Sequence, residues 1–136
     1  MRASLIDTDI LSMFFRNDPE VIAYLASYLT RHKKINISII TYYEIISGLM
    51  HRDARKQTAL FLDFVSKNNV LPLSEQSVKI SAEIYAELRK EGKPLDDIDL
   101  LIAGIAVAED LVLATHNRKH FARIRRLEIE ELRTCK

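Results

Sequence analysis

One stretch of the sequence decides the fold class: residues 2–11, RASLIDTDIL. Residues 3–6 are too few for a helix and have the composition of a strand, and the apolar residues after Asp9 return at helical spacing. We therefore expect a buried strand that ends at Asp7. In open α/β sheets the catalytic crevice lies beyond the carboxyl ends of the strands, so Asp7 is the first candidate for a functional residue. The alternative is that Asp7 or Asp9 caps the helix that follows.

The composition is that of one ordinary domain. The chain has 136 residues, 48% hydrophobic and 29% charged, as in a soluble globular protein. No apolar run could span a bilayer and no signal peptide is recognisable, so we expect a cytoplasmic protein without a membrane contact. The one cysteine, Cys135, has no partner for an internal disulfide or a zinc site. Because the net charge is only +1, a polyanion would have to be held by a local basic patch.

Strands and helices alternate along the chain. Strands are expected at residues 3–6, 35–40, 70–73, 111–114 and, at a sheet edge, 127–129. Helices are expected at residues 8–15, from residue 19, from residue 41, and at 54–66, 75–91, 97–109 and 117–123. This order predicts an α/β fold: a single domain over residues 1–136, with three α/β/α layers and a mostly parallel sheet of four or five strands.

Apolar residues at helical spacing predict which side of each helix faces the core. The helix at 97–109 is apolar almost all round, so it must be covered on more than one side. Gly92 stands where a helix end usually has glycine. The side chains expected to face inward are Val21, Ile22, Leu25, Tyr28, Leu29, Tyr42, Ile45, Ile46, Leu49, Leu60, Phe61, Phe64, Val65, Val78, Ala82, Tyr85 and Leu88.

Further polar residues stand where this fold would bring them near Asp7. They are Glu44, shortly after the second strand, Asp96, Asp97 and Asp99, at the start of the apolar helix, and Asn117, beyond the fourth strand. Each acid also has a structural interpretation. Thr41 to Glu44 match a capping box, and residues 96–99 could cap their helix.

The joint pattern favours a metal site over separate caps. Carboxylates that gather at one edge repel one another and raise one another's pKa, so the cluster is costly unless a cation occupies it. Oxygen ligands without histidine or cysteine suit Mg²⁺ or Mn²⁺, which keep waters for substrate phosphates. The four histidines, His32, His51, His116 and His120, have no ligand spacing and are expected at the surface. These residues therefore predict metal-assisted phosphodiester chemistry.

Four segments together resemble the signature segments of PIN-domain ribonucleases, most closely the VapC-type toxins. They are residues 5–12 (LIDTDILS), 37–45 (ISIITYYEI), 99–103 (DLLIA) and 113–117 (LATHN). The resemblance implies that Asp7, Glu44 and Asp99 bind Mg²⁺, that Asn117 fills a fourth position, and that Asp9, where the family usually has Asn, orients the site. Residues 95–98, LDDI, depart from the family, which commonly has glycine there. It is therefore open whether Asp96 or Asp97 joins the site.

The same resemblance implies a Mg²⁺-dependent endoribonuclease that is the toxin of a type II toxin–antitoxin pair. A metal-activated water would leave a 5′-phosphate and a 3′-hydroxyl. An antitoxin would cover the acidic crevice, and a homodimer would bury some of Tyr24, Tyr28, Phe61 and Phe64. RNA backbone could be held by the basic residues after Asn117, unless these form a solvated surface: Arg118, Lys119, His120, Arg123, Arg125 and Arg126.

Two other classes of function fit parts of the pattern. Residues 7–9, DTD, imitate the nucleophile motif of haloacid-dehalogenase-like phosphatases, but Leu11 stands where that motif has Thr or Val. A non-catalytic binding module, in which the acids only cap helices, is the second alternative. Trapping of an aspartyl-phosphate would support the phosphatase, and a lack of Mg²⁺ or Mn²⁺ binding would support the module.

Overall fold

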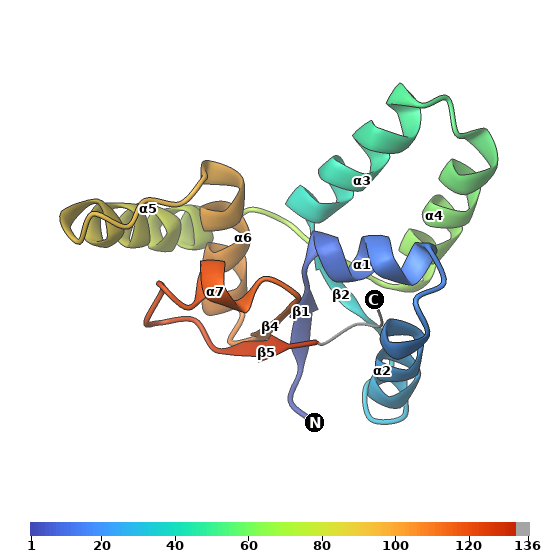
Figure 1. Ribbon diagram of the computed structural model, residues 1–136, viewed down its shortest axis with the longest axis horizontal. Helices are drawn as coiled ribbons and strands as arrows, with labels where there is room; N and C mark the ends of the chain where they lie inside the picture. The colour runs from blue at the N-terminus through green and yellow to red at the C-terminus, as the bar shows by residue number, and fades with distance from the viewer. Residues whose placement is uncertain (133–136) are drawn as a thin grey trace.

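The computed structural model describes residues 1–132, so Cys135 lies outside the described residues (Figure 1). The strands are β1 Ser4–Ile6, β2 Asn36–Ser38, β3 Asn69–Leu71, β4 Val112–Thr115 and β5 Ile129–Glu131. The helices are α1 Thr8–Phe15, α2 Pro19–Leu29, α3 Ile39–His51, α4 Arg55–Lys67, α5 Glu75–Lys90, α6 Asp97–Ala108 and α7 Arg118–Phe121. No helix among these residues is long and apolar enough to cross a bilayer.

The five strands form one sheet in the order β3-β2-β1-β4-β5, and every described pair is parallel. The predicted α/β class is confirmed. The chain builds outward from β1 to β2 and β3, then returns to the other side of β1 to add β4 and β5. The switch point of the sheet therefore lies between β1 and β4, where ligand sites of open α/β sheets are usually found.

Helices cover both faces of this sheet, which gives three layers (Figure 1). Successive strand residues point to opposite faces, and β1 follows this rule. Leu5 packs into the core formed with α5 and α6, whereas Ile6 packs into the core formed with α1, α2, α3 and α4. Leu113 and Ala114 of β4 divide between the two cores in the same way.

The second strand is shorter than predicted, because a helix begins inside the β-branched run. Ser38 ends β2 and caps α3, where its hydroxyl accepts a hydrogen bond from the backbone N–H of Thr41 at 2.9 Å. Ile39 and Ile40, predicted as strand, form the first residues of α3. The cap residue, rather than the strand preference of isoleucine, decides this boundary.

Several predicted inward positions are wrong. The residues that were predicted to face inward but are exposed are Ile22, Leu29, Leu60, Val78, Ala82 and Tyr85. In α5 the buried stripe runs instead through Ser77, Ile80, Ser81, Ile84 and Leu88. These small serine side chains let α5 approach α6 closely at Gly104, so the stripe differs from the one that the largest apolar residues predict.

The other element predictions agree with the structure within a few residues. Gly92 follows the C-cap of α5, Glu91. Its φ of 69° is the left-handed conformation expected for a glycine at this position. Helix α6 is buried on several sides, as its all-round apolar sequence predicts.

We expect Gly104→Ala to destabilise the fold, because a Cβ there would lie 2.5 Å from the Ser77 carbonyl oxygen and closer still to the Ser81 hydroxyl. Overpacking of this kind costs about 1–3 kcal/mol. Gly48→Ala in α3 is the matched control: its Cβ would lie 3.9 Å from Arg52 Nη1, an ordinary contact, and the substitution should stabilise the protein by about 0.5–1 kcal/mol. Urea unfolding measures both, and equal stability of Gly104→Ala and the parent would contradict the close packing of α5 on α6.

Candidate active site

Asp7 follows β1 directly, and its side chain is 6% exposed. Its Oδ1 accepts a hydrogen bond from the backbone N–H of Thr8 at 2.9 Å, so Asp7 does cap α1. Its Oδ2 accepts a second from the Thr115 hydroxyl at 2.8 Å. Burial, followed by the charge of Asp9, raises the pKa of Asp7 to about 7. The capping role and the buried position at the strand end therefore coexist.

Asp9 connects the first turn of α1 to the end of β4. Its Oδ2 accepts hydrogen bonds from the backbone N–H of His116 at 3.1 Å and from the Thr115 hydroxyl at 3.4 Å. Burial also raises the pKa of Asp9. Thr115 thus contacts both aspartates, a role that the sequence analysis missed. The register of β1 against β4, which pairs Ile6 with Ala114, puts Thr115 beside Asp7.

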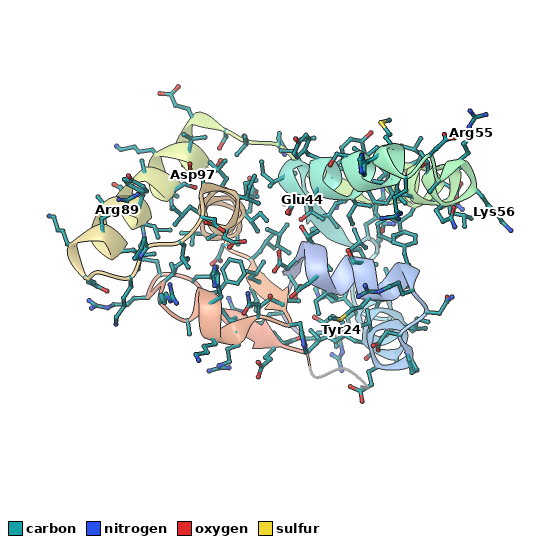
Figure 2. All side chains as sticks on the ribbon, turned by 45° about the horizontal axis from the view of Figure 1, so that its top comes forward. Tyr24, Glu44, Arg55, Lys56, Arg89 and Asp97 are labelled. Atoms are coloured by element: carbon teal, nitrogen blue, oxygen red, sulfur yellow. The ribbon has the colours of Figure 1, made fainter. Side chains whose placement is uncertain are left out.

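Glu44 does not belong to a capping box, so that interpretation is wrong. The N-cap of α3 is Ser38 instead of Thr41, and Glu44 consequently lies beyond the first turn of α3. Its Oε1 accepts a hydrogen bond from the Thr8 hydroxyl at 2.6 Å. Figure 2 shows Glu44 near the beginning of α1, whereas Arg55 lies at the far end of the α3–α4 hairpin.

Asp99 lies in the first turn of α6, where its Oδ2 is 2.9 Å from His120 Nε2. Burial raises the pKa of Asp99, and the nearby imidazole of His120 opposes this shift. Asp96 stands at the N-cap position but makes no side-chain capping hydrogen bond, and its charge contributes to the raised pKa of Asp99. Asp97 lines a shallow groove between α5 and α6 instead, with Val78 as a neighbour.

The histidines divide into two groups. His51 and His116 are exposed, as expected. His32 and His120 are only partly exposed, because His32 stacks on Tyr28 with a ring separation of 4.4 Å and His120 contacts Asp99. These two histidines therefore reach the surface, as expected, but each ring is also in contact with a neighbouring side chain.

The predicted acids lie at one edge of the sheet, but their carboxylates do not converge on a single position. The charges of Asp9 and Asp99 both act on Asp7, and Thr8 links Asp7 to Glu44. Within residues 1–132, however, no three acidic, histidine or cysteine side chains lie as a ready metal-binding group. Asn117 follows β4, is exposed, and donates its backbone N–H to the Thr115 hydroxyl at 3.0 Å.

The chemistry of these donors still fits a hard divalent ion. Mg²⁺ usually takes one or two protein carboxylates and completes its shell with water and substrate, so it does not need a closed group of three. Among the described residues, Glu44 Oε2 and Asp99 Oδ1 accept no hydrogen bond. Both carboxylates therefore have an oxygen left for a ligand.

The basic residues after Asn117 differ in whether their side chains already bind another part of the protein. Arg123 donates to the Pro94 carbonyl oxygen at 2.9 Å. Arg125 forms an ion pair at 3.0 Å with Glu91, the residue that caps the end of α5, and Arg126 forms one at 3.0 Å with Glu83 on α5. Arg118 and Lys119 are exposed and have no ion pair or hydrogen bond from their side chains to residues 1–132.

A groove of about 410 Å³ opens beside Glu44, between α1, α3 and α4. Its apolar lining includes Phe15, Ile45, Leu49, Leu60 and Phe61, and its polar lining includes Thr8, Ser12, Arg16, Glu44, Arg52 and Gln57. The groove thus joins an apolar surface to the acidic edge.

An acidic edge at the switch point of a parallel sheet is suited to hydrolysis of phosphodiesters, and comparison with known proteins identifies the class as nucleases. A family model of the PIN domain matches residues 4–127, so the chain belongs to the PIN-domain family. The expectation of a PIN-domain, VapC-type nuclease is confirmed, and the phosphatase and the non-catalytic module are both wrong.

The relatives span nearly the whole chain. Ribonuclease VapC1 of Haemophilus influenzae is 32% identical over 128 residues, 93% of this chain and 96% of the relative. The tRNA(fMet)-specific endonuclease VapC of Salmonella typhimurium shows the same identity and coverage. Among solved structures, VapBC2 from Rickettsia felis, bound to a DNA fragment from its promoter, has a TM-score of 0.87 and 27% identity, and covers 96% of this chain and 99% of that chain. DNA-bound VapBC from Salmonella typhimurium has a TM-score of 0.85 and 31% identity, and covers 96% and 98%.

The raised pKa of Asp7 predicts a pH-dependent stability in metal-free buffer. Between the ordinary value of 3.8 and about 7 the folded state holds a proton that the unfolded chain has lost. The contribution of Asp7 is therefore present at low pH and is lost as the pH rises through about 7. Relative to Asp7→Asn, the parent should lose on the order of 3 kcal/mol of unfolding free energy over this window. Denaturant unfolding at several pH values measures the difference, and parallel curves for the two proteins would contradict it.

Proposed function

We propose that this protein is a Mg²⁺-dependent endoribonuclease, with Mn²⁺ as a possible substitute, and that it acts as the toxin of a type II toxin–antitoxin pair. One observation carries the proposal: Asp7 is buried at the switch point, and Thr8 joins it to Glu44 there, while burial and the charges of Asp9 and Asp99 raise its pKa. A divalent cation at this edge would remove that cost. The ribonuclease names of the relatives support RNA as the substrate.

In this proposal Asp7, Glu44 and Asp99 hold the ion, which when bound would supply an activated water and a charge that stabilises the leaving oxygen. The backbone N–H groups of Ile10 and His116 hold the two oxygens of Asp9 between α1 and β4, which supports an orienting role for this side chain. Asn117 makes no side-chain capping hydrogen bond among the described residues, which supports its assignment to a fourth position at the same edge.

The acids before Asp99 receive different roles. Asp96 remains a candidate additional ligand, because its side chain makes no cap and its charge acts on Asp99. Asp97 is left out, because it lines the groove between α5 and α6.

We assign RNA backbone contacts to Arg118 and Lys119, which follow Asn117 and have exposed side chains without a partner in residues 1–132. Cations of this kind bind phosphates and make affinity salt-dependent. Arg123 is better explained as a structural contact, since it donates to the Pro94 carbonyl oxygen.

An antitoxin partner is supported by the solved relatives, which are toxin–antitoxin complexes. The groove beside Glu44 offers an apolar surface at which a partner segment would cover the acidic edge. The homodimer also remains part of the proposal. Of the aromatic residues considered for its interface, Tyr28 and Phe61 are buried within the monomer and are therefore excluded. Tyr24 and Phe64 are partly exposed and stay candidates for the interface.

Isosteric changes test the metal ligands. Glu44→Gln and Asp99→Asn each remove an anionic oxygen, so RNA cleavage and the rise of melting temperature with added Mg²⁺ should both collapse. Asp97→Asn is the matched control on the same helix and should behave like the parent. Cleavage assays and thermal unfolding with and without Mg²⁺ measure these effects. Full activity of Glu44→Gln, or equal stabilisation by Mg²⁺ of the parent and Asp99→Asn, would refute the assignment.

A pair of substitutions on α4 tests the partner. Leu60 is 56% exposed and lines the groove, whereas Leu62 is 43% exposed and lies outside it. Leu60→Asp should weaken inhibition by the protein encoded beside the toxin gene at least tenfold, with nuclease activity retained, and Leu62→Asp should be inhibited like the parent. Inhibition titrations and light scattering of the co-purified complex provide the data. Equal inhibition of both variants would place the antitoxin elsewhere, and a monomeric mass of the toxin at micromolar concentration would exclude the homodimer.

A further inference from the structure

Thr8 contacts two of the carboxylates that we assign to the metal. Its backbone N–H donates to Asp7 Oδ1 at 2.9 Å, and its hydroxyl donates to Glu44 Oε1 at 2.6 Å. Asp7 follows β1 and Glu44 lies on α3, so Thr8 joins residues from separate elements. The short hydrogen bond to Glu44 is of the charge-assisted kind, in which an ionised acceptor strengthens the contact.

The hydroxyl of Thr8 is itself held by a series of hydroxyls. Ser38 Oγ donates to Thr41 Oγ1 at 3.3 Å, and Thr41 Oγ1 lies 2.9 Å from Thr8 Oγ1. Each hydroxyl has a single proton to donate. Because the Thr8 proton goes to Glu44, Thr8 must accept from Thr41, and Thr41 in turn accepts from Ser38. The protons therefore all point in one direction, toward the carboxylate.

Burial makes this hydroxyl series a fixed part of the structure. Ser38 and Thr41 are both 0% exposed, so water does not compete for their hydroxyls. The Ser38 hydroxyl is further anchored because it accepts the backbone N–H of Thr41 and thereby caps α3. Hydrogen bonds that follow one another in a buried chain polarise and strengthen each other.

We propose that Thr8 is a positioning residue of this nuclease, and that Thr41 and Ser38 fix its hydroxyl so that Glu44 keeps Oε1 on Thr8 and offers Oε2 to the metal. This inference rests on the proposed metal-dependent function. The inference gives a common role to Thr8, Thr41 and Ser38, whose hydroxyl-to-hydroxyl contacts are explained neither by helix capping nor by core packing. Hydrogen bonds to a ligating carboxylate orient it and affect metal affinity, typically by about 10- to 100-fold.

Calorimetric titration of the metal-free protein with Mn²⁺ tests the inference without relying on activity. Thr8→Val keeps the shape and the backbone bond to Asp7, removes the hydroxyl, and should weaken Mn²⁺ binding about tenfold. Thr8→Ser restores the hydroxyl and should bind nearly as the parent does. Thr41→Val should cause a smaller loss, because Thr8 can still reach Glu44. The double variant should bind no more weakly than Thr8→Val, since Thr41 acts through Thr8.

Ser81→Ala is the matched control for loss of a buried hydroxyl. Ser81 donates to the Leu100 carbonyl oxygen at 2.7 Å and lies between α5 and α6, outside the site. Its loss should lower the melting temperature and leave Mn²⁺ affinity unchanged. Circular dichroism confirms that each variant folds, and if Thr8→Val does not, Thr41→Val and Thr8→Ser carry the test.

The outcomes separate this inference from the proposed function. If the parent binds Mn²⁺ and Asp7→Asn does not, while Thr8→Val and Thr41→Val bind like the parent, the positioning role is wrong and the metal site stands. If Thr8→Val weakens Mn²⁺ binding but the losses in the double variant simply add, Thr41 does not act through Thr8, and the part of the inference that concerns the hydroxyl series is wrong. If the parent and Asp7→Asn bind Mn²⁺ equally, the proposed metal site itself fails.

Discussion

Burial of the Asp7 carboxyl group at the edge between β1 and β4, with further acids close by, is the constraint on which the site depends. Asp7 is almost fully buried there, and the charges of Asp9 and Asp99 both act on it. The protein offsets part of this cost with hydrogen bonds and one imidazole contact: Thr115 and Thr8 bind Asp7, and His120 lies against Asp99. The start of α1 also presents backbone N–H groups to Asp7, which favours the charged form. A divalent cation would relieve the repulsion that remains.

The rest of the fold serves to bring helix starts to this edge. Alternate residues of β1 pack into two separate cores, so the strand is held from both faces and Asp7 emerges at a fixed place. On one side the close contact of α5 with Gly104 positions α6, whose first turn carries Asp99. On the other side the Ser38 cap sets where α3 begins, and hence where Glu44 lies. Packing far from the acids therefore controls the geometry of the acids.

The fold class and the acids at this edge of the sheet could be predicted from the sequence. A short apolar run indicates a strand, and the polar residues that follow it indicate where the strand ends. The prediction failed for the start of α3, since a β-branched run hides a helix cap at Ser38. It also failed for the outward faces of α2, α4 and α5, where apolar residues lie on both sides of the helix and spacing alone does not choose. The contacts of Thr115 with Asp7 and of His120 with Asp99 join elements that only the tertiary structure brings together.

The central claim is that this edge holds a divalent cation, and anomalous diffraction from crystals grown with Mn²⁺ tests it most directly. The account predicts an anomalous peak at the manganese edge at about 2.1 Å from a carboxylate oxygen of Asp7 and from one of Glu44 or Asp99. Side chains of Glu44 and Asp99 should turn toward the ion, with Glu44 still bonded to Thr8. Crystals that show no peak at this edge with Mn²⁺ present in excess, or a peak only elsewhere on the protein, would contradict it.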